Sequence, residues 1–303
     1  MSIANNGVLV DLNISVWTGR KMDKKVSGEV DAAKQTKTKA GNYHKNLFAG
    51  TDKLERVNSV AGKIRNWHLK ETLPWSDSGT RLLPMGNFFE YKQTLGALET
   101  EFYDAVTDFI AAYPNLISAA AFQIGALFNR DDYPSEDKIK DKFRVKSAFT
   151  PVPLSGDFRV DTDAAAQQQL RDEYEKMYRQ KEEETAKELW ERLHSYLTTL
   201  VDRLDKKQQA IEKAELEDSQ NAAEGITKRG KSGQFHESHL TNGIELCSLL
   251  SRLNIMNDPS LEAARKYLEA ALSGVTAKDI RTSEGTRNEV KARVKDILGK
   301  FDF

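Results

Sequence analysis

The chain has 303 residues, of which 39% are hydrophobic and 30% are charged, and its formal net charge is −1. This apolar content excludes a wholly disordered protein, and the small net charge excludes a global field that would draw the molecule to nucleic acid or membranes. The single cysteine, Cys247, rules out an internal disulfide and fits a reducing compartment. Because no window approaches 18 consecutive apolar residues and no basic start precedes an apolar run, we expect neither a membrane span nor a signal peptide.

The first 130 residues predict one strand followed by helices. Apolar and polar residues alternate over residues 7–17, which is typical of a strand with one buried face. A helix should begin near Thr51 and a second near Asn87, and Pro114 should end that second helix. The stretch 115–128 is apolar on most sides, so we expect it to form a separate helix central to the core.

A basic stretch lies early in the chain. Residues 18–70 contain 13 Lys and Arg against 5 Asp and Glu, a net charge of +8. Lysine and arginine neutralise phosphates, and nearby rings such as Trp17, Tyr43 and Phe48 are of the kind that stack on bases. The candidate nucleic-acid-binding residues are Arg20, Lys21, Lys24, Lys25, Lys34, Lys37, Lys39 and Lys45. The alternatives are a solvated helical face, or a surface that docks on the acidic helix of another subunit.

A turn-rich segment follows the apolar stretch. Residues 143–145 and 158–160 each read Phe-Arg-Val, and they bracket Pro151 and Pro153. This pattern predicts a β-hairpin with a wide loop. Together with the strand at 7–17, the hairpin could form a small antiparallel sheet.

A long helix is predicted over residues 163–223, inside a stretch without proline. Apolar residues with alternating spacings of three and four form a narrow seam along it, typical of a helix that packs lengthwise on another helix. The seam residues are Trp190, Leu193, Leu197, Leu200, Leu204 and Ile211. Lys207 interrupts the seam, and the seam could pair with another molecule or fold back on the same chain. Residues 163–224 carry 10 Lys and Arg against 16 Asp and Glu, a net charge of −6.

The remaining residues predict a basic, glycine-containing connector and three short helices. The letters from Gly225 to Ser232 satisfy the Walker A pattern, but a polar, helix-like segment precedes them where a phosphate-binding loop needs an apolar strand. His236 and His239, with Cys247 eight residues on, supply at most part of a zinc site, and the alternative is a polar helix start followed by a core cysteine. We therefore expect no cofactor, no metal and no catalytic residue, and a protein that is not an enzyme.

Several short sequence segments resemble an uncharacterised family of bacteriophage and prophage proteins. They are Val10-Asp11-Leu12-Asn13-Ile14-Ser15 with Trp17 and Gly19-Arg20-Lys21, the run from Asp132-Tyr133-Pro134-Ser135 through Phe143, Phe149-Thr150-Pro151-Val152-Pro153 with Gly156-Asp157-Phe158-Arg159-Val160, and Arg252-Leu253-Asn254-Ile255 with Asn257-Asp258-Pro259. Genes of that family lie beside a MoxR-type AAA+ ATPase and a von Willebrand factor A protein. The resemblance implies a phage or mobile-element origin and an AAA+ ATPase as partner, and it supplies no catalytic residues. We further expect the protein to act in the host cytoplasm.

These observations predict an α+β protein that is predominantly α, with long coiled-coil-like helices and a small antiparallel sheet. The expected domains are a helical core with the sheet (1–161), a long helical arm (162–224) and a C-terminal helical unit (225–303). The expected function is that of a non-enzymatic phage-type adaptor or assembly protein, which associates with itself or with a phage or host protein through the seam. The alternative is a nucleic-acid-binding protein in recombination, replication or DNA protection that uses residues 18–70.

Overall fold

The computed structural model describes residues 3–153, 164–223 and 234–301. It is predominantly helical with two small sheets, which confirms the predicted fold class. The chain forms two compact units. The C-terminal unit comprises Met1–Leu9, Glu71–Asn87 and Thr150–Phe303, and the inserted unit comprises Val10–Lys70 and Phe88–Phe149.

The division differs from the predicted one, whose boundaries fell after residues 161 and 224. The chain leaves the C-terminal unit twice and returns to it twice, so the units interleave along the sequence. The long helix is grouped with the helices that follow it and is not a separate arm. Domain boundaries predicted from composition do not reveal this grouping of helices, because the core that joins them is assembled from segments distant in the sequence.

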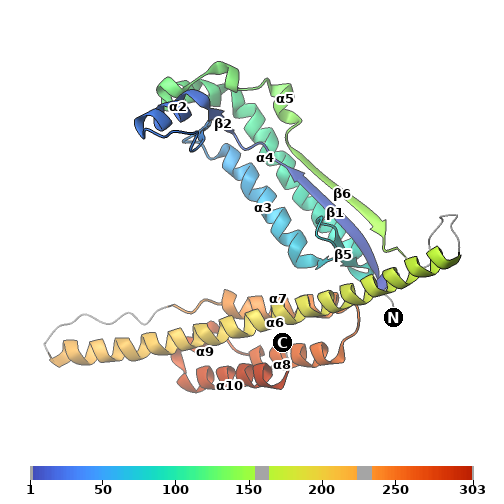
Figure 1. Cartoon of the computed structure of the whole chain (residues 1–303). Coiled ribbons are helices and arrows are strands. Elements are labelled where there is room, and N and C mark those ends of the chain that lie inside the picture. Colours follow the sequence, from blue (N-terminus) through green and yellow to red (C-terminus); the bar gives the residue numbers. More distant parts are fainter. Residues whose placement is uncertain (1–2, 154–163, 224–233, 302–303) are drawn as a thin grey trace. The chain divides into compact units, whose positions relative to one another are not determined.

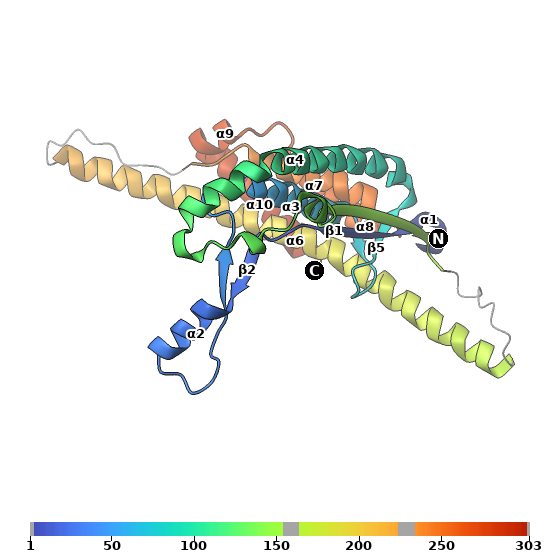
Figure 2. The ribbon, with the colours of Figure 1, turned by 90° about the horizontal axis from the view of Figure 1, so that it is seen from above.

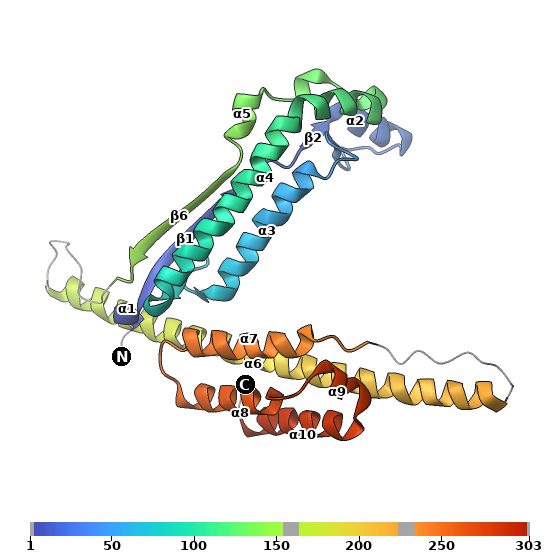
Figure 3. The ribbon, with the colours of Figure 1, turned by 180° about the vertical axis from the view of Figure 1, so that it is seen from behind.

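The inserted unit is built on helices α3 (Lys53–Glu71) and α4 (Phe88–Gln123), which lie side by side (Figures 1 and 3). Its elements are most of β1 (Gly7–Ser15), β2 (Arg20–Asp23), α2 (Lys24–Ala33), β3 (Tyr43–Asn46), α3 (Lys53–Glu71), α4 (Phe88–Gln123), the turns η2 (Gly125–Leu127) and η3 (Arg130–Asp132), α5 (Glu136–Lys140) and β6 (Arg144–Pro151). The helix predicted from Thr51 is α3, and the Thr51 hydroxyl accepts the Lys53 N–H at 3.3 Å. Its apolar stripe is buried, as the spacing of Leu54, Val57 and Ile64 predicts.

Helix α4 does not end at Pro114, so that prediction is wrong. It runs unbroken from Phe88 to Gln123 with the proline inside. A proline removes one backbone hydrogen bond, and burial of Tyr113 and Ile117 on either side holds the helix in line. The expectation that residues 115–128 are central to the core is also wrong, because Phe122 is 89% exposed.

The stretch Met85–Gln123 is long and apolar enough to cross a membrane, judged by length and composition alone. About a third of its most apolar window, 33%, is buried inside the fold. Core helices of soluble proteins give the same result, so this stretch is weak evidence for a membrane protein.

The larger sheet has the strand order β4-β5-β1-β6. Strands β4 (Leu73–Pro74) and β5 (Arg81–Pro84) are antiparallel, with Leu73 opposite Leu82. Strand β6 lies beside β1 and runs the other way (Figures 1 and 3). The structure thus has the predicted strands at 7–17 and 143–151, whereas the second hairpin strand, at 158–160, lies outside the described residues.

The C-terminal unit is organised by one helix of 60 residues, α6 (Ala164–Ala223), which is the predicted long helix as a single rod. The other elements of this unit are α1 (Ile3–Asn6), η1 (Met85–Asn87), α7 (Ser238–Leu253), α8 (Pro259–Leu272), α9 (Ala277–Thr282) and α10 (Glu284–Lys300). Helices α7 to α10 pack along the middle of α6, which continues past them at both ends (Figures 1 and 3). The three predicted short helices are α7, α8 and α10, and α9 is an additional turn with a Thr276–Asp279 capping box.

Candidate nucleic-acid interface

The basic residues gather on a small element that stands out from one end of the inserted unit (Figure 2). We call it the basic excursion and define it as residues 20–46, comprising β2, α2, the following loop and β3. It contains eight Lys or Arg against three Asp or Glu, a net of +5, in a chain whose net charge is −1. Strands β2 and β3 are antiparallel, with Arg20 opposite Asn46 and Asp23 opposite Tyr43.

Hydrogen bonds from short polar side chains give the excursion its shape. The Asp23 carboxylate caps α2 by accepting the N–H groups of Lys25 and Val26, both at 3.1 Å. The buried Ser27 hydroxyl accepts the Tyr43 N–H at 3.0 Å and donates to the Asp23 carbonyl at 2.6 Å. Helix α2 and strand β3 are therefore joined directly, although Ser27 and Tyr43 are separated by a loop.

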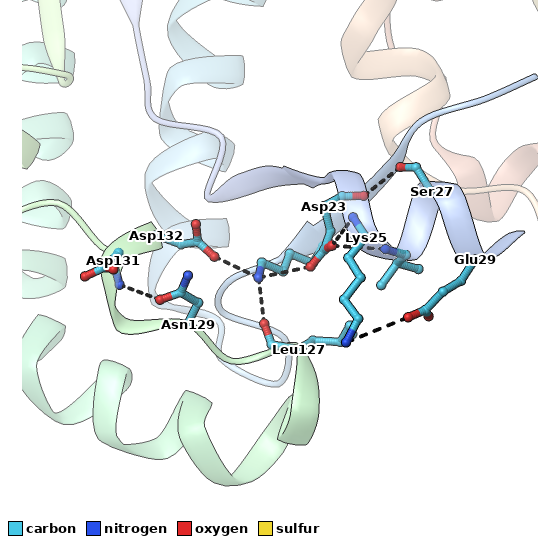
Figure 4. Close-up of polar contacts among 10 residues, drawn as sticks. Asp23, Lys25, Ser27, Glu29, Leu127, Asn129, Asp131 and Asp132 are labelled. Atoms are coloured by element: carbon cyan, nitrogen blue, oxygen red, sulfur yellow. Dashed lines mark hydrogen bonds and ion pairs between the residues drawn. The ribbon is translucent and has the colours of Figure 1, made fainter. Parts of the chain in front are cut away.

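Lys45 is a structural cation, and its assignment to a nucleic-acid surface is corrected. Its side chain is 6% exposed, and its Nζ lies 2.7 Å from Asp132 Oδ2 and 3.3 Å from Asp23 Oδ2. It also donates to the Leu127 carbonyl at 2.6 Å. Asp23, Leu127 and Asp132 converge on this point (Figure 4).

The Lys45 cluster ties the excursion to the turns η2 and η3. Burial alone would lower the pKa of Lys45, but its hydrogen bonds to Asp132 and Asp23 outweigh this and raise the pKa above the usual value. The N–H of Val26, followed by Lys45, holds the pKa of Asp23 below its usual value. A buried lysine with two carboxylates has no capacity left for a phosphate, because its charge is already compensated.

The other seven predicted cations are exposed. Arg20 and Lys21 lie on β2, Lys24 and Lys25 begin α2, and the remaining three lie at its end and in the loop, at positions 34, 37 and 39. Lys25 approaches Glu29 at 4.0 Å, and within the described part of the chain the other six form no ion pair. These six charges are available to a soluble anion.

Of the three predicted stacking rings, Tyr43 is the most accessible. Phe48 is 3% exposed and lies in an aromatic cluster with Trp17, Phe109 and Tyr113, whose ring centroids are 5.5–6.4 Å apart. The Phe48 ring is therefore part of the core of the inserted unit, and Trp17 is half-buried against it. Tyr43 is 38% exposed, and its ring borders a hollow in the excursion.

The hollow lies between the second half of α2 and the loop that returns to β3. Its volume is about 310 Å³, and its lining includes Val30, Asp31, Lys34, Thr36, Asn42 and Tyr43. The loop is held open by Asp31, whose carbonyl accepts the Thr36 N–H at 3.0 Å and whose carboxylate accepts the Ala40 N–H at 3.3 Å. The hollow is thus formed by the backbone path of the loop as well as by side chains.

The predicted partner-binding seam is already occupied by the same chain. Leu193, Leu197, Leu200 and Leu204 are at most 1% exposed, in the core that α6 forms with α7, α8 and α10. Trp190 is half-buried and donates from its indole N–H to Asp258 Oδ2 at 3.1 Å.

Ile211, at the far end of the seam, is half-buried. The docking role that we predicted for these residues is therefore corrected, because the seam is intramolecular and not a free surface.

The structure gives no support to either of the two candidate chemical sites, the Walker A segment and the partial zinc site. The Walker A letters, residues 225–232, lie entirely outside the described residues. Within the described ranges, no group of three or more His, Cys, Asp or Glu side chains is placed to hold a metal ion. Cys247 is buried, its pKa is raised to about 11 by that burial, and its thiol faces the Arg265 carbonyl at 3.6 Å. His239 is engaged by Arg203, at 2.7 Å from Nε2.

Comparison of the chain with family models, with curated proteins and with solved structures finds no match.

Proposed function

We propose that the protein binds nucleic acid through the basic excursion, which contacts the phosphate backbone. The observation that carries the proposal is the contrast between Lys45, which is buried with two carboxylates, and seven exposed cations, six of them without an ion pair in the described structure. A cation cluster that served stability would be expected to have its counterions within the fold, as Lys45 does.

The arrangement of the charges also supports a polyanionic ligand. The seven cations are distributed over β2, α2 and the loop of one hydrogen-bonded element, so several phosphates of one strand would be contacted together. Each neutralised phosphate releases counterions. In a plot of the logarithm of the binding constant against the logarithm of the salt concentration, each phosphate contact therefore contributes about 0.7 to 0.9 to the downward slope.

A binding titration tests the proposal. We expect a labelled oligonucleotide to bind the wild-type protein at low salt, with an affinity that falls steeply as NaCl is added. In the triple variant Lys34→Gln, Lys37→Gln and Lys39→Gln, the logarithmic salt slope should fall by about 2 to 3, because three phosphate contacts are lost. The measurement is fluorescence anisotropy over a series of salt concentrations.

A matched control removes three exposed lysines of the C-terminal unit, Lys176, Lys206 and Lys278, by the same change to Gln. This control has the same net charge as the first variant and should bind like the wild type. Absence of binding by the wild-type protein at low salt, or an equal loss in both triple variants, would contradict the proposal.

Self-association is the second candidate function, and one observation favours it. Helix α6 begins well before the helices that pack on it, and among residues 165–177 none of the side chains is buried. A second copy, or the AAA+ ATPase that the sequence resemblance suggests, could bind there, away from the occupied seam. Light scattering after size-exclusion chromatography tests this candidate, and a monomer at all concentrations, alone and mixed with such an ATPase, would contradict it.

A further inference from the structure

The hollow beside Tyr43 indicates which form of nucleic acid the excursion takes. We infer that it holds one unstacked base of a single strand, with the base against the Tyr43 ring and the flanking phosphates on the loop lysines. The inference rests on the proposed function, since it assumes that the excursion binds nucleic acid.

The hollow has the size and the walls that a planar heterocycle needs. Its volume of about 310 Å³ is at the lower end of small-molecule sites, which suits one ring system and not an extended ligand. The Tyr43 ring and Val30, 38% and 50% exposed, supply apolar surface that water now contacts. Stacking a base on such a ring is favourable for every base, because each has a π-face.

Polar groups line the same hollow. Asn42 has an amide that can donate and accept, and the Thr36 hydroxyl, which donates to the Asp31 carbonyl at 3.3 Å, can still accept. A base edge carries both donors and acceptors, so these groups match it better than they match a purely apolar ligand. Duplex bases are stacked and paired, and therefore only an unpaired base can enter.

The cations lie where the neighbouring phosphates of such a strand would run. Lys34 lines the hollow itself, and positions 37 and 39 follow in the same loop. Base and backbone recognition would therefore share the loop that joins α2 to β3.

The experiment compares three labelled probes on the wild-type protein and its variants: a single strand, the corresponding duplex, and a single strand in which abasic sites replace the bases. The wild type should prefer the intact single strand over the other two. Tyr43→Leu should weaken single-strand binding by roughly 5- to 150-fold, the range measured for loss of one stacked base, and leave the salt slope unchanged. Tyr43→Phe, which keeps the ring, should bind like the wild type.

DNA and RNA versions of the single strand show which sugar is accepted, and binding of either supports the inference. Equal affinity of the wild type for all three probes would overturn it while leaving the proposed function intact, and this arm needs no variant that must fold. Equal single-strand affinities of Tyr43→Leu and the wild type, with matching circular dichroism melts, would also overturn it. Failure of every probe to bind would instead overturn the proposed function.

Discussion

Lys45 differs from the other cations of the excursion in what surrounds its ammonium group. Two carboxylates and one carbonyl accept its three N–H donors, and the carbonyl, that of Leu127, lies 82 residues further along the sequence. The residue therefore positions the excursion, and its neighbours in the sequence carry the exposed charge. The same residue type thus has two roles within one short segment, and burial decides between them.

Replacing Lys45 by Met should destabilise the protein by about 3–5 kcal/mol, because Asp23 and Asp132 would then face each other without a cation. The double variant Lys45→Met and Asp132→Asn should recover part of this loss. Urea unfolding followed by circular dichroism measures both. A loss under 1 kcal/mol would contradict the assigned role.

The pH dependence of the same variant has a definite sign. The pKa of Lys45 is raised above 10.5, so its contribution is complete below that pH and is lost as the pH rises through the folded-state value. The pKa of Asp23 is lowered below 3.8, so its contribution is present above that pH and is lost as the pH falls. The difference in the free energy of unfolding between the wild type and Lys45→Met should therefore be largest between about pH 4 and 10.

At the scale of elements, helix α7 packs tightly against two neighbouring helices at Gly243. A Cβ built there would lie 2.5 Å from Leu272 Cδ1 of α8 and would also overlap Tyr196 of α6. The Tyr196 hydroxyl donates to the His239 carbonyl at 2.8 Å, which keeps the ring in place. Only glycine permits this approach of three helices.

Gly243→Ala should therefore destabilise the C-terminal unit by about 1–3 kcal/mol, the usual effect of overpacking a tight core. Gly299→Ala, in α10, is the matched control: nothing lies within 4 Å of its added Cβ, so it should be neutral or stabilise by up to about 1 kcal/mol. Thermal unfolding of the two variants distinguishes them. Equal melting temperatures would show that Tyr196 and Leu272 adapt without cost.

The elements themselves could largely be predicted from the sequence, because periodicity and caps are local signals. The start of α3 was predicted from Thr51, and the extent of α6 was predicted from a stretch without proline. The candidate site could be predicted only in part. The exposed cations are visible as a charge cluster, but the burial of Lys45 depends on Asp132, and nothing local links the two. The seam at Leu193–Leu204 could likewise be recognised from its spacing. The helices that cover it could not be predicted, because they are brought to it only by the tertiary fold.

For the molecule as a whole, the net charge predicts weak repulsion between copies in solution, whereas the distribution of charge predicts attraction. The isoelectric point is about 6.6 and the net charge is −1, so the molecules repel one another weakly near neutral pH. Residues 18–70 and 163–224, with net charges of +8 and −6, can attract each other between molecules.

Solubility should accordingly be lowest near pH 6.6 and should increase when salt is added, because screening weakens attraction between opposite patches. Precipitation by polyethylene glycol over a range of pH and NaCl measures this. The triple variant Lys34→Gln, Lys37→Gln and Lys39→Gln should respond less to salt at a given distance from its own isoelectric point. Solubility that falls with added NaCl would contradict the expectation.

The burial of the α6 seam has a consequence for synthesis on the ribosome. Leu193, Leu197, Leu200 and Leu204 are covered by helices that end only at Lys300, so about 100 more residues must be translated before the seam is complete. At about 5–20 residues per second this takes on the order of 5–20 s. During that interval a nascent α6 presents a leucine stripe to its surroundings, and a chaperone that covers this stripe until α10 has been synthesised would assist folding.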